Sequence, residues 1–149
     1  MTPAIFTEVG ERLTRALLTG DFELYRQVID LPFRTEPRGG TPYTLETPEA
    51  LEKDFRLYHQ AVTIQKITDI YRMVEAIEPL GEHAWRVHCL MHIIEGARLA
   101  VEPFEMRACL RRAGDRWKIF RIESSLRHIN WSLGQDPLAA GGGAGPGPQ

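Results

Sequence analysis

Residues 83–95 read His83-Ala-Trp-Arg-Val-His-Cys-Leu-Met-His-Ile-Ile-Glu95, and residues 104–119 read Phe104-Glu-Met-Arg-Ala-Cys-Leu-Arg-Arg-Ala-Gly-Asp-Arg-Trp-Lys-Ile119. Apolar and polar side chains alternate along both runs, which is the period of a β-strand. Turn-forming residues at 79–81, 95–97 and 113–115 separate these runs from their neighbours. The pattern predicts four antiparallel strands, near residues 65–78, 83–95, 99–112 and 116–125.

The first half of the chain has helical spacing instead. A first helix is expected to begin at Thr2-Pro3, to carry its apolar residues on one face and to stop at Gly20. Asp21 can cap a second, shorter helix that ends at Leu31-Pro32. A third helix begins at Thr47-Pro48. Between residues 33 and 46 the prolines and glycines leave room only for short extended pieces. Because no helices separate the later strands, the order favours a segregated α+β fold over a parallel α/β sheet.

Composition limits the class of protein. The chain has 149 residues, about one domain, and its 43% hydrophobic and 26% charged residues exclude a disordered or fibrous chain. A formal charge of -2 argues against nucleic acid as a partner. No apolar run approaches the ~20 residues that span a membrane, and the N-terminus lacks the basic start of a secretion signal, so a cytoplasmic location is expected. Cys89 and Cys109 are expected to be buried thiols.

The last part of the chain differs from the rest. Six of the 13 glycines follow Leu133, in a segment with little apolar surface to bury. We therefore expect one folded domain over residues 1–131 and a flexible tail over residues 132–149.

The order of these elements resembles the nuclear transport factor 2-like superfamily over about residues 3–126. The segments that carry the resemblance are Gly20-Asp-Phe-Glu-Leu-Tyr-Arg26, Thr47-Pro-Glu-Ala-Leu51 and Leu110-Arg-Arg-Ala-Gly-Asp-Arg-Trp-Lys-Ile119. The resemblance implies three N-terminal helices packed in a strongly curved antiparallel sheet, a cone-like α+β barrel with a pocket inside and often a dimer through the outer sheet face. The superfamily includes ketosteroid isomerases, scytalone dehydratase, SnoaL-like polyketide cyclases, transport adaptors and many members without assigned activity, so the fold does not select a function.

Strand alternation places a set of polar side chains on one face of the expected sheet, and a shift in register by two residues would leave them on that face. The set comes from three neighbouring strands and consists of Asp69, Tyr71, His88, His92, Glu105 and Arg107. With Leu90 and Met73 beside them they form a mixed face, as in a cavity lined by apolar groups with a few polar ones. A histidine beside a carboxylate can act as a general base, and an arginine can stabilise a carboxylate or an enolate.

We expect His88 and Arg107 to form the anion-binding end of such a pocket. The alternative is that the set makes cross-strand ion pairs on an exposed or dimer-facing sheet surface. Metal binding by His88 and His92 is not expected, because four residues along a strand separate the two imidazoles by roughly 13 Å. No cofactor is expected either.

Two tyrosines on the helices, Tyr25 and Tyr58, are expected to reach the pocket mouth. Alternatively they are core aromatics whose hydroxyls find a partner. The resemblance to ketosteroid isomerases implies a helix-borne tyrosine donor, an aspartate base and a protonated strand aspartate. Tyr25 and Asp30 are the nearest matches to the first two, but Arg107 or Cys109 occupies the strand position. This departure argues against isomerase chemistry.

Both faces of the expected sheet carry large apolar residues. Trp85, Met91 and Phe104 lie on one face, and Leu90 and Ile94 lie on the other. One layer of helices covers only one face, so we expect a homodimer through the uncovered face. The expected function is binding of a small, partly apolar and, through Arg107, anionic molecule. The alternatives are a cofactor-free isomerase, dehydratase or polyketide-cyclase-like enzyme, and a non-catalytic adaptor or dimerisation module.

Overall fold

Three helices follow the caps that the sequence supplies. In this computed structural model, which describes residues 1–37 and 40–124, they are α1 (Pro3–Thr19), α2 (Phe22–Val28) and α3 (Pro48–Ile64). The side chains of Thr2, Asp21 and Thr47 each accept a hydrogen bond from a backbone N–H three residues on, as N-cap residues do. The expected domain boundary at residue 131 and the tail over residues 132–149 lie outside the described residues.

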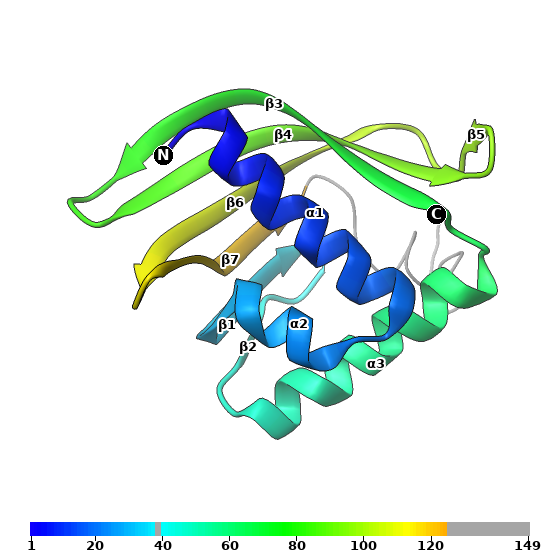
Figure 1. Cartoon of the computed structure of the whole chain (residues 1–149), viewed down its shortest axis with the longest axis horizontal. Coiled ribbons are helices and arrows are strands. Elements are labelled where there is room, and N and C mark those ends of the chain that lie inside the picture. Colours follow the sequence, from blue (N-terminus) through cyan, green and yellow to red (C-terminus); the bar gives the residue numbers. More distant parts are fainter. Residues whose placement is uncertain (38–39, 125–149) are drawn as a thin grey trace.

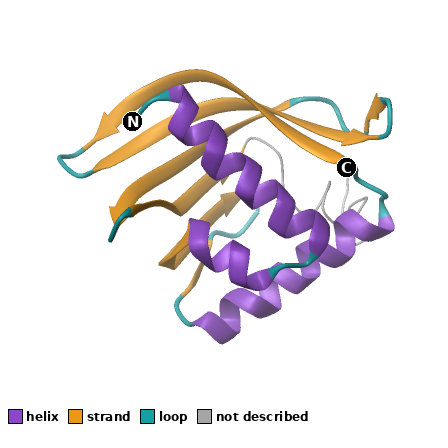
Figure 2. Ribbon diagram, in the orientation of Figure 1, coloured by secondary structure: helices purple, strands orange, loops and turns teal. Residues whose placement is uncertain are grey.

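Seven strands form one sheet beside the helices. They are β1 (Ile29–Pro37), β2 (Tyr43–Leu45), β3 (Asp69–Leu80), β4 (Ala84–Glu95), β5 (Arg98–Leu99), β6 (Phe104–Ala113) and β7 (Arg116–Ser124). The hydrogen-bonded order is β2-β1-β7-β6-β4-β3, and β5 pairs with the end of β4. Figure 1 and Figure 2 show β3 and β4 bending over α1, with α2 and α3 next to that helix. The α+β class predicted from the sequence is confirmed.

The sheet is mixed, which corrects the expectation of antiparallel pairing throughout. β1 runs parallel to β7, with Ile29 opposite Ile119 and Thr35 opposite Ile122. The sheet is also not closed into a barrel, because β2 and β3 are the two ends of its order. The result is an open, cone-like sheet.

The end of α2 and the start of β1 also differ from the sequence-based expectation. α2 ends at Val28 rather than near Leu31-Pro32, and β1 begins at once at Ile29. Ile29 and Phe33 are both buried in the core, and this burial favours the extended conformation. Pro32 falls where the register between β1 and β7 shifts, so its missing N–H interrupts no regular ladder.

The turns of the meander lie where the sequence predicts them. The glycines at these turns, Gly81, Gly96 and Gly114, all have positive φ. Glycine adopts this left-handed conformation without the strain that a Cβ would cause. The three turns separate β3 from β4, β4 from β5 and β6 from β7.

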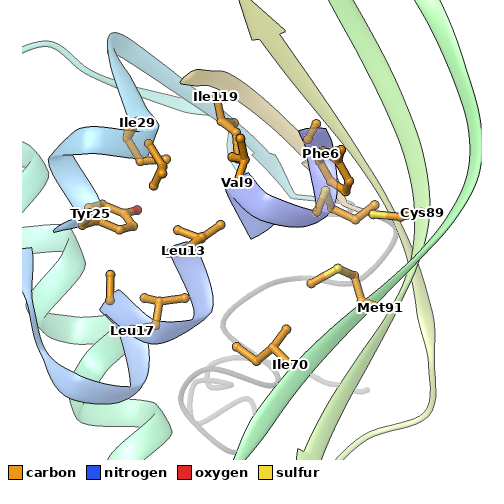
Figure 3. Packing of buried hydrophobic residues seen from close by; sticks show 14 of the residues in the cluster. Phe6, Val9, Leu13, Leu17, Tyr25, Ile29, Ile70, Cys89, Met91 and Ile119 are labelled. Atoms are coloured by element: carbon orange, nitrogen blue, oxygen red, sulfur yellow. The ribbon is translucent and has the colours of Figure 1, made fainter. Parts of the chain in front are cut away.

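The apolar face of the sheet is the one that meets the helices, and we call it the inner face. On β4, Val87, Cys89, Met91 and Ile93 are buried, whereas their neighbours between them are partly exposed. Figure 3 shows Cys89 and Met91 opposite buried residues of α1, among them Phe6, Val9, Leu13 and Leu17. Cys89 and Cys109 are both buried free thiols, as expected. No helix within residues 1–37 and 40–124 is long and apolar enough to cross a membrane.

Candidate functional site

A cavity of about 100 Å³ lies between the helices and the inner face, and we call it the inner cavity. Its wall is mostly apolar and includes Leu13 and Leu17 of α1, Ile70 of β3 and Met91 of β4. Figure 3 shows these four side chains turned toward a common space. Cavities of this size hold several waters or a small organic molecule.

One side of the inner cavity carries a hydrogen-bonded chain of polar groups. Asp54 and Tyr58 both line the cavity, because residues four apart on a helix share a face. The hydroxyl of Tyr43, on β2, donates a hydrogen bond to Oδ1 of Asp54 over 3.1 Å. A second hydrogen bond joins Tyr58 to Tyr43. β2 and α3 together therefore hold a carboxyl group at the cavity wall.

Burial changes the acidity of this cluster. It raises the pKa of Asp54, although the hydrogen bond from Tyr43 acts in the opposite direction. It also raises the pKa of Tyr25, Tyr43 and Tyr58, and the nearby Asp54 raises each further. The phenols keep their protons at neutral pH and can act as hydrogen-bond donors. Asp54 keeps its proton to a higher pH than an exposed aspartate.

Tyr25 of α2 lines the same cavity from the opposite helix. Its side chain is only 5% exposed, and its ring packs on Phe55 of α3 with 4.6 Å between ring centroids. Figure 3 shows the hydroxyl pointing away from α2 into the space between the helices and the sheet. No residue in the described part of the chain forms a hydrogen bond with this hydroxyl. The hydroxyl is not among the fully buried, unpartnered atoms of the described residues, so it remains accessible.

Arg72 brings a positive charge to the cavity wall. It lies on the inner face of β3, two residues after Ile70, and reaches across to α1. Its Nη1 donates hydrogen bonds to the backbone oxygen of Gly10 over 3.0 Å and to Oγ1 of Thr14 over 2.7 Å. A Cβ at position 10 would lie 3.2 Å from Cδ of Arg72, so the glycine leaves room for this side chain. Burial lowers the pKa of Arg72 to about 10, so the guanidinium stays charged at neutral pH.

The structure divides the eight candidate residues between the two sheet faces. Tyr25 and Tyr58 line the inner cavity. The other six lie on the face turned away from the helices, which we call the outer face: Asp69, Tyr71, His88, His92, Glu105 and Arg107. These six share a face because strand alternation groups them. The helices, however, cover the more apolar face, which carries Arg72, and leave the mixed one outside.

On the outer face the candidate residues take part in cross-strand contacts. His88 lies directly opposite Arg107 on the neighbouring strand, but each pairs with a carboxylate elsewhere. His88 contacts Glu78, and Nε of Arg107 lies 3.2 Å from Oε1 of Glu123. The ring of Tyr71 lies 5.6 Å from that of His92, centroid to centroid. Exposed pairs of this kind contribute about 0–1 kcal/mol each, so they say little about function.

A shallow groove beside Arg107 does not suit an anion. It is lined by Glu36, Glu105 and Glu123 together with Arg107. Arg107 is already paired with Glu123, and Arg121 pairs with both Glu36 and Glu123, so these charges are used within the protein. Among residues 1–37 and 40–124, no group of three or more His, Cys, Asp or Glu side chains is placed to hold a metal ion.

Comparisons with known proteins show the fold. No protein-family model and no curated protein matches the sequence. A nuclear transport factor 2-like protein of unknown function from Shewanella oneidensis has a TM-score of 0.62 at 13% identity, over 83% of this chain and 98% of that one. The chain has the nuclear transport factor 2-like fold. A domain of unknown function with a cystatin-like fold from Nostoc punctiforme matches with a TM-score of 0.58 at 14% identity, over 85% of this chain and 79% of that one.

A further neighbour with the nuclear transport factor 2-like fold is named as a candidate dehydratase, from Streptomyces avermitilis. It has a TM-score of 0.58 at 14% identity, over 81% of this chain and 92% of that one. Identities this low show the nuclear transport factor 2-like fold alone, and the function of this chain has to be argued from its own site.

The sequence analysis did not identify three polar residues of the site: Asp54 and Arg72, which line the cavity, and Tyr43, the hydrogen-bond partner of Asp54. Two of them had a usable signal: Asp54 stands four residues before Tyr58 on a helix, and Arg72 stands on the strand face of Ile70. Tyr43 had none, because it lies in the Pro- and Gly-rich stretch where the pattern predicts only short extended pieces, without bounds or partners.

Proposed function

We propose that this protein binds one small, partly apolar molecule in the inner cavity. The observation that carries the proposal is Tyr25, which lines the inner cavity and whose hydroxyl is accessible and has no hydrogen-bond partner within residues 1–37 and 40–124. A ligand that accepts a hydrogen bond from this donor gains an oriented polar contact in a mostly apolar space.

The rest of the wall supports the same reading. Apolar side chains surround most of the space, while Asp54 and Tyr58 add polar groups near Tyr25. A mostly apolar pocket with a few converging polar groups is the usual form of a small-molecule site. The small volume restricts the ligand to a single ring or a short branched chain.

Ligand-observed NMR with a library of small-ring and short-chain compounds tests the proposal. Ile70→Phe fills the inner cavity from β3, and Leu17→Phe fills it from α1. Met73→Phe is the matched control, because it adds the same ring on β3 but on the outer face, where Met73 is exposed.

Compounds that bind the wild type and Met73→Phe but neither filling variant support the proposal. The proposal is wrong if every compound that binds also binds both filling variants, or if no compound binds at millimolar concentration, which corresponds to about -4 kcal/mol.

A cofactor-free reaction in the same cavity is the second candidate function, and the raised pKa of Asp54 favours it. A carboxyl group that titrates closer to neutral pH suits proton transfer to or from a bound molecule. Asp54→Asn then leaves ligand binding in place and removes turnover. If turnover of a bound compound survives in Asp54→Asn, Asp54 is not the acid or base.

A further inference from the structure

Arg72 is a cation in a wall that is otherwise mainly apolar. Of its nitrogens, only Nη1 forms hydrogen bonds within the described residues, to Gly10 and Thr14 of α1. A guanidinium carries five N–H donors, and Nη1 supplies two of them. The donors on Nε and Nη2 have no protein partner among the described residues, and neither atom is fully buried. Arg72 is one of the residues that line the inner cavity, so a molecule inside it meets this side chain.

The charge of Arg72 also lacks a carboxylate within ion-pair distance in the described part of the chain. The nearest acidic residue along the strand, Asp69, is exposed and accepts a hydrogen bond from the backbone N–H of Ile70. By contrast, Arg107, Arg111 and Arg121 each lie within 3.2 Å of an acidic oxygen. Arg72 is half-buried, and removing a charge from water is costly, so desolvation lowers its pKa, although Cys89 and Asp69 act in the opposite direction.

We propose that Arg72 is the anion-binding residue of the inner cavity and that the ligand is a small monocarboxylic acid with an apolar body. The proposal rests on the proposed function and adds the chemical class of the ligand. A carboxylate matches the planar fork formed by Nε and Nη2, which can donate two parallel hydrogen bonds to its two oxygens. The apolar wall then surrounds the body of the acid.

The same wall argues against a phosphate. Arg72 is the only Lys or Arg among the residues that line the inner cavity within the described part of the chain. A phosphate carries up to two charges and three strong acceptor oxygens, for which one fork is too little. Asp54 also lines the cavity, and a second negative charge on the ligand would add to the repulsion from its carboxylate.

Matched acid and amide pairs test the proposal by isothermal titration at neutral pH. The probes are benzoate with benzamide and isobutyrate with isobutyramide, so that each pair differs in charge but hardly in shape. Benzoate or isobutyrate is expected to bind the wild type at least tenfold more tightly than its amide. Arg72→Met is expected to weaken the acid by 10–100-fold and to change the amide by less than twofold. Arg107→Met, the control on the outer face, leaves both unchanged.

A structural role for Arg72 predicts a different result, because loss of its contacts with α1 would weaken acid and amide alike. Chemical shifts of the Arg72 Nε–H group in the wild type give a second measurement that needs no variant. They move on titration with the acid and stay in place with the amide if the proposal is right. Unchanged Nε–H shifts with a bound acid overturn it, even where Arg72→Met fails to fold.

The outcomes separate this proposal from the proposed function. If the amides bind the wild type as tightly as the acids do, and do not bind Ile70→Phe, the role proposed for Arg72 is wrong but the inner cavity is still a binding site. If the acids no longer bind Arg107→Met but still bind Arg72→Met, the anion binds on the outer face and the proposal is overturned. If neither acids nor amides bind, the proposal about Arg72 fails, and the compound library then decides whether the proposed function fails with it.

Discussion

The hydroxyl of Tyr43 lies 3.1 Å from Oδ1 of Asp54 and donates a hydrogen bond to it, which links the short strand β2 to the middle of α3. This contact lowers the pKa of Asp54 while burial raises it, and burial is the larger effect. The pKa of Asp54 at the cavity wall therefore depends on Tyr43, which the sequence analysis did not identify as a candidate site residue.

Tyr43→Phe is expected to raise the pKa of Asp54 further, because the phenylalanine removes the donor that stabilises the carboxylate. The lost hydrogen bond to a charged group should also lower the free energy of unfolding by about 1.5–3 kcal/mol at neutral pH. Carbon-detected NMR titration of the aspartate carboxyls measures the pKa, and urea unfolding measures the stability. Tyr71→Phe, at an exposed position, is the control and should change neither. A pKa of Asp54 that falls or stays the same in Tyr43→Phe contradicts the assignment.

Asp54→Asn is expected to change how stability depends on pH. The folded-state pKa of Asp54 is raised, so its proton is held more tightly in the folded than in the unfolded chain. Its contribution to stability is therefore present below the unfolded pKa, about 3.9, and is lost as the pH rises through the folded pKa. As the pH rises through this window, the wild type loses this contribution and Asp54→Asn does not. The free energy of unfolding of Asp54→Asn should therefore rise relative to that of the wild type, as measured by urea titrations from pH 3.5 upward. A difference that stays flat or falls shows that the folded pKa is not raised.

Gly10→Ala is expected to displace Arg72 without unfolding the protein. The new Cβ would lie 3.2 Å from Cδ and 3.4 Å from Nη1 of Arg72, so the side chain has to move. Alanine favours the helix by about 1 kcal/mol, and this gain offsets the crowding, so stability should stay within about 1 kcal/mol of the wild type. The preference for benzoate over benzamide should drop at the same time. Thr7→Ala, at an exposed position of α1, is the control. If Gly10→Ala still prefers benzoate over benzamide as the wild type does, Arg72 tolerates the displacement.

We also propose a homodimer through the outer face, where Tyr71 and Met73 of β3 are 54% and 40% exposed. Specific interfaces typically bury about 1,200–2,000 Å² in total. Light scattering after gel filtration should give about twice the 17.0 kDa of one chain at micromolar concentration. Met73→Glu should halve that mass and leave the melting temperature of the monomer unchanged at high dilution. A wild-type mass near 17.0 kDa would rule the dimer out.

The period of the strands predicts which residues share a face, but it does not say what covers each face. Tyr71, His88 and Arg107 group together in the sequence pattern and in the structure alike. The inner face could have been identified by its lack of charge, because helices pack on the more apolar side. Arg72 is the exception on that face, and a single charged residue in an alternating strand does not reveal whether it reaches solvent or a cavity.

The parallel pairing of β1 with β7 and the hydrogen-bond partner of Asp54 were harder to predict from the sequence. β1 holds two prolines, Pro32 and Pro37, and its partner lies at the far end of the described chain. No local pattern encodes contacts between segments so distant in sequence. The helix that carries Asp54 is predictable from its cap at Thr47 and its apolar stripe, whereas the partner of Asp54 is not.

The pairing of Ile29 with Ile119 has a consequence for synthesis of the chain. β1 leaves the ribosome long before β7, and at 5–20 residues per second the delay is on the order of ten seconds. During that time β1 has no partner on its β7 side, and contacts this distant in sequence are slow to form even in the complete chain. Since β1 and β7 both contribute to the cavity wall, a ligand would meet a finished binding site only after nearly the whole domain has been made.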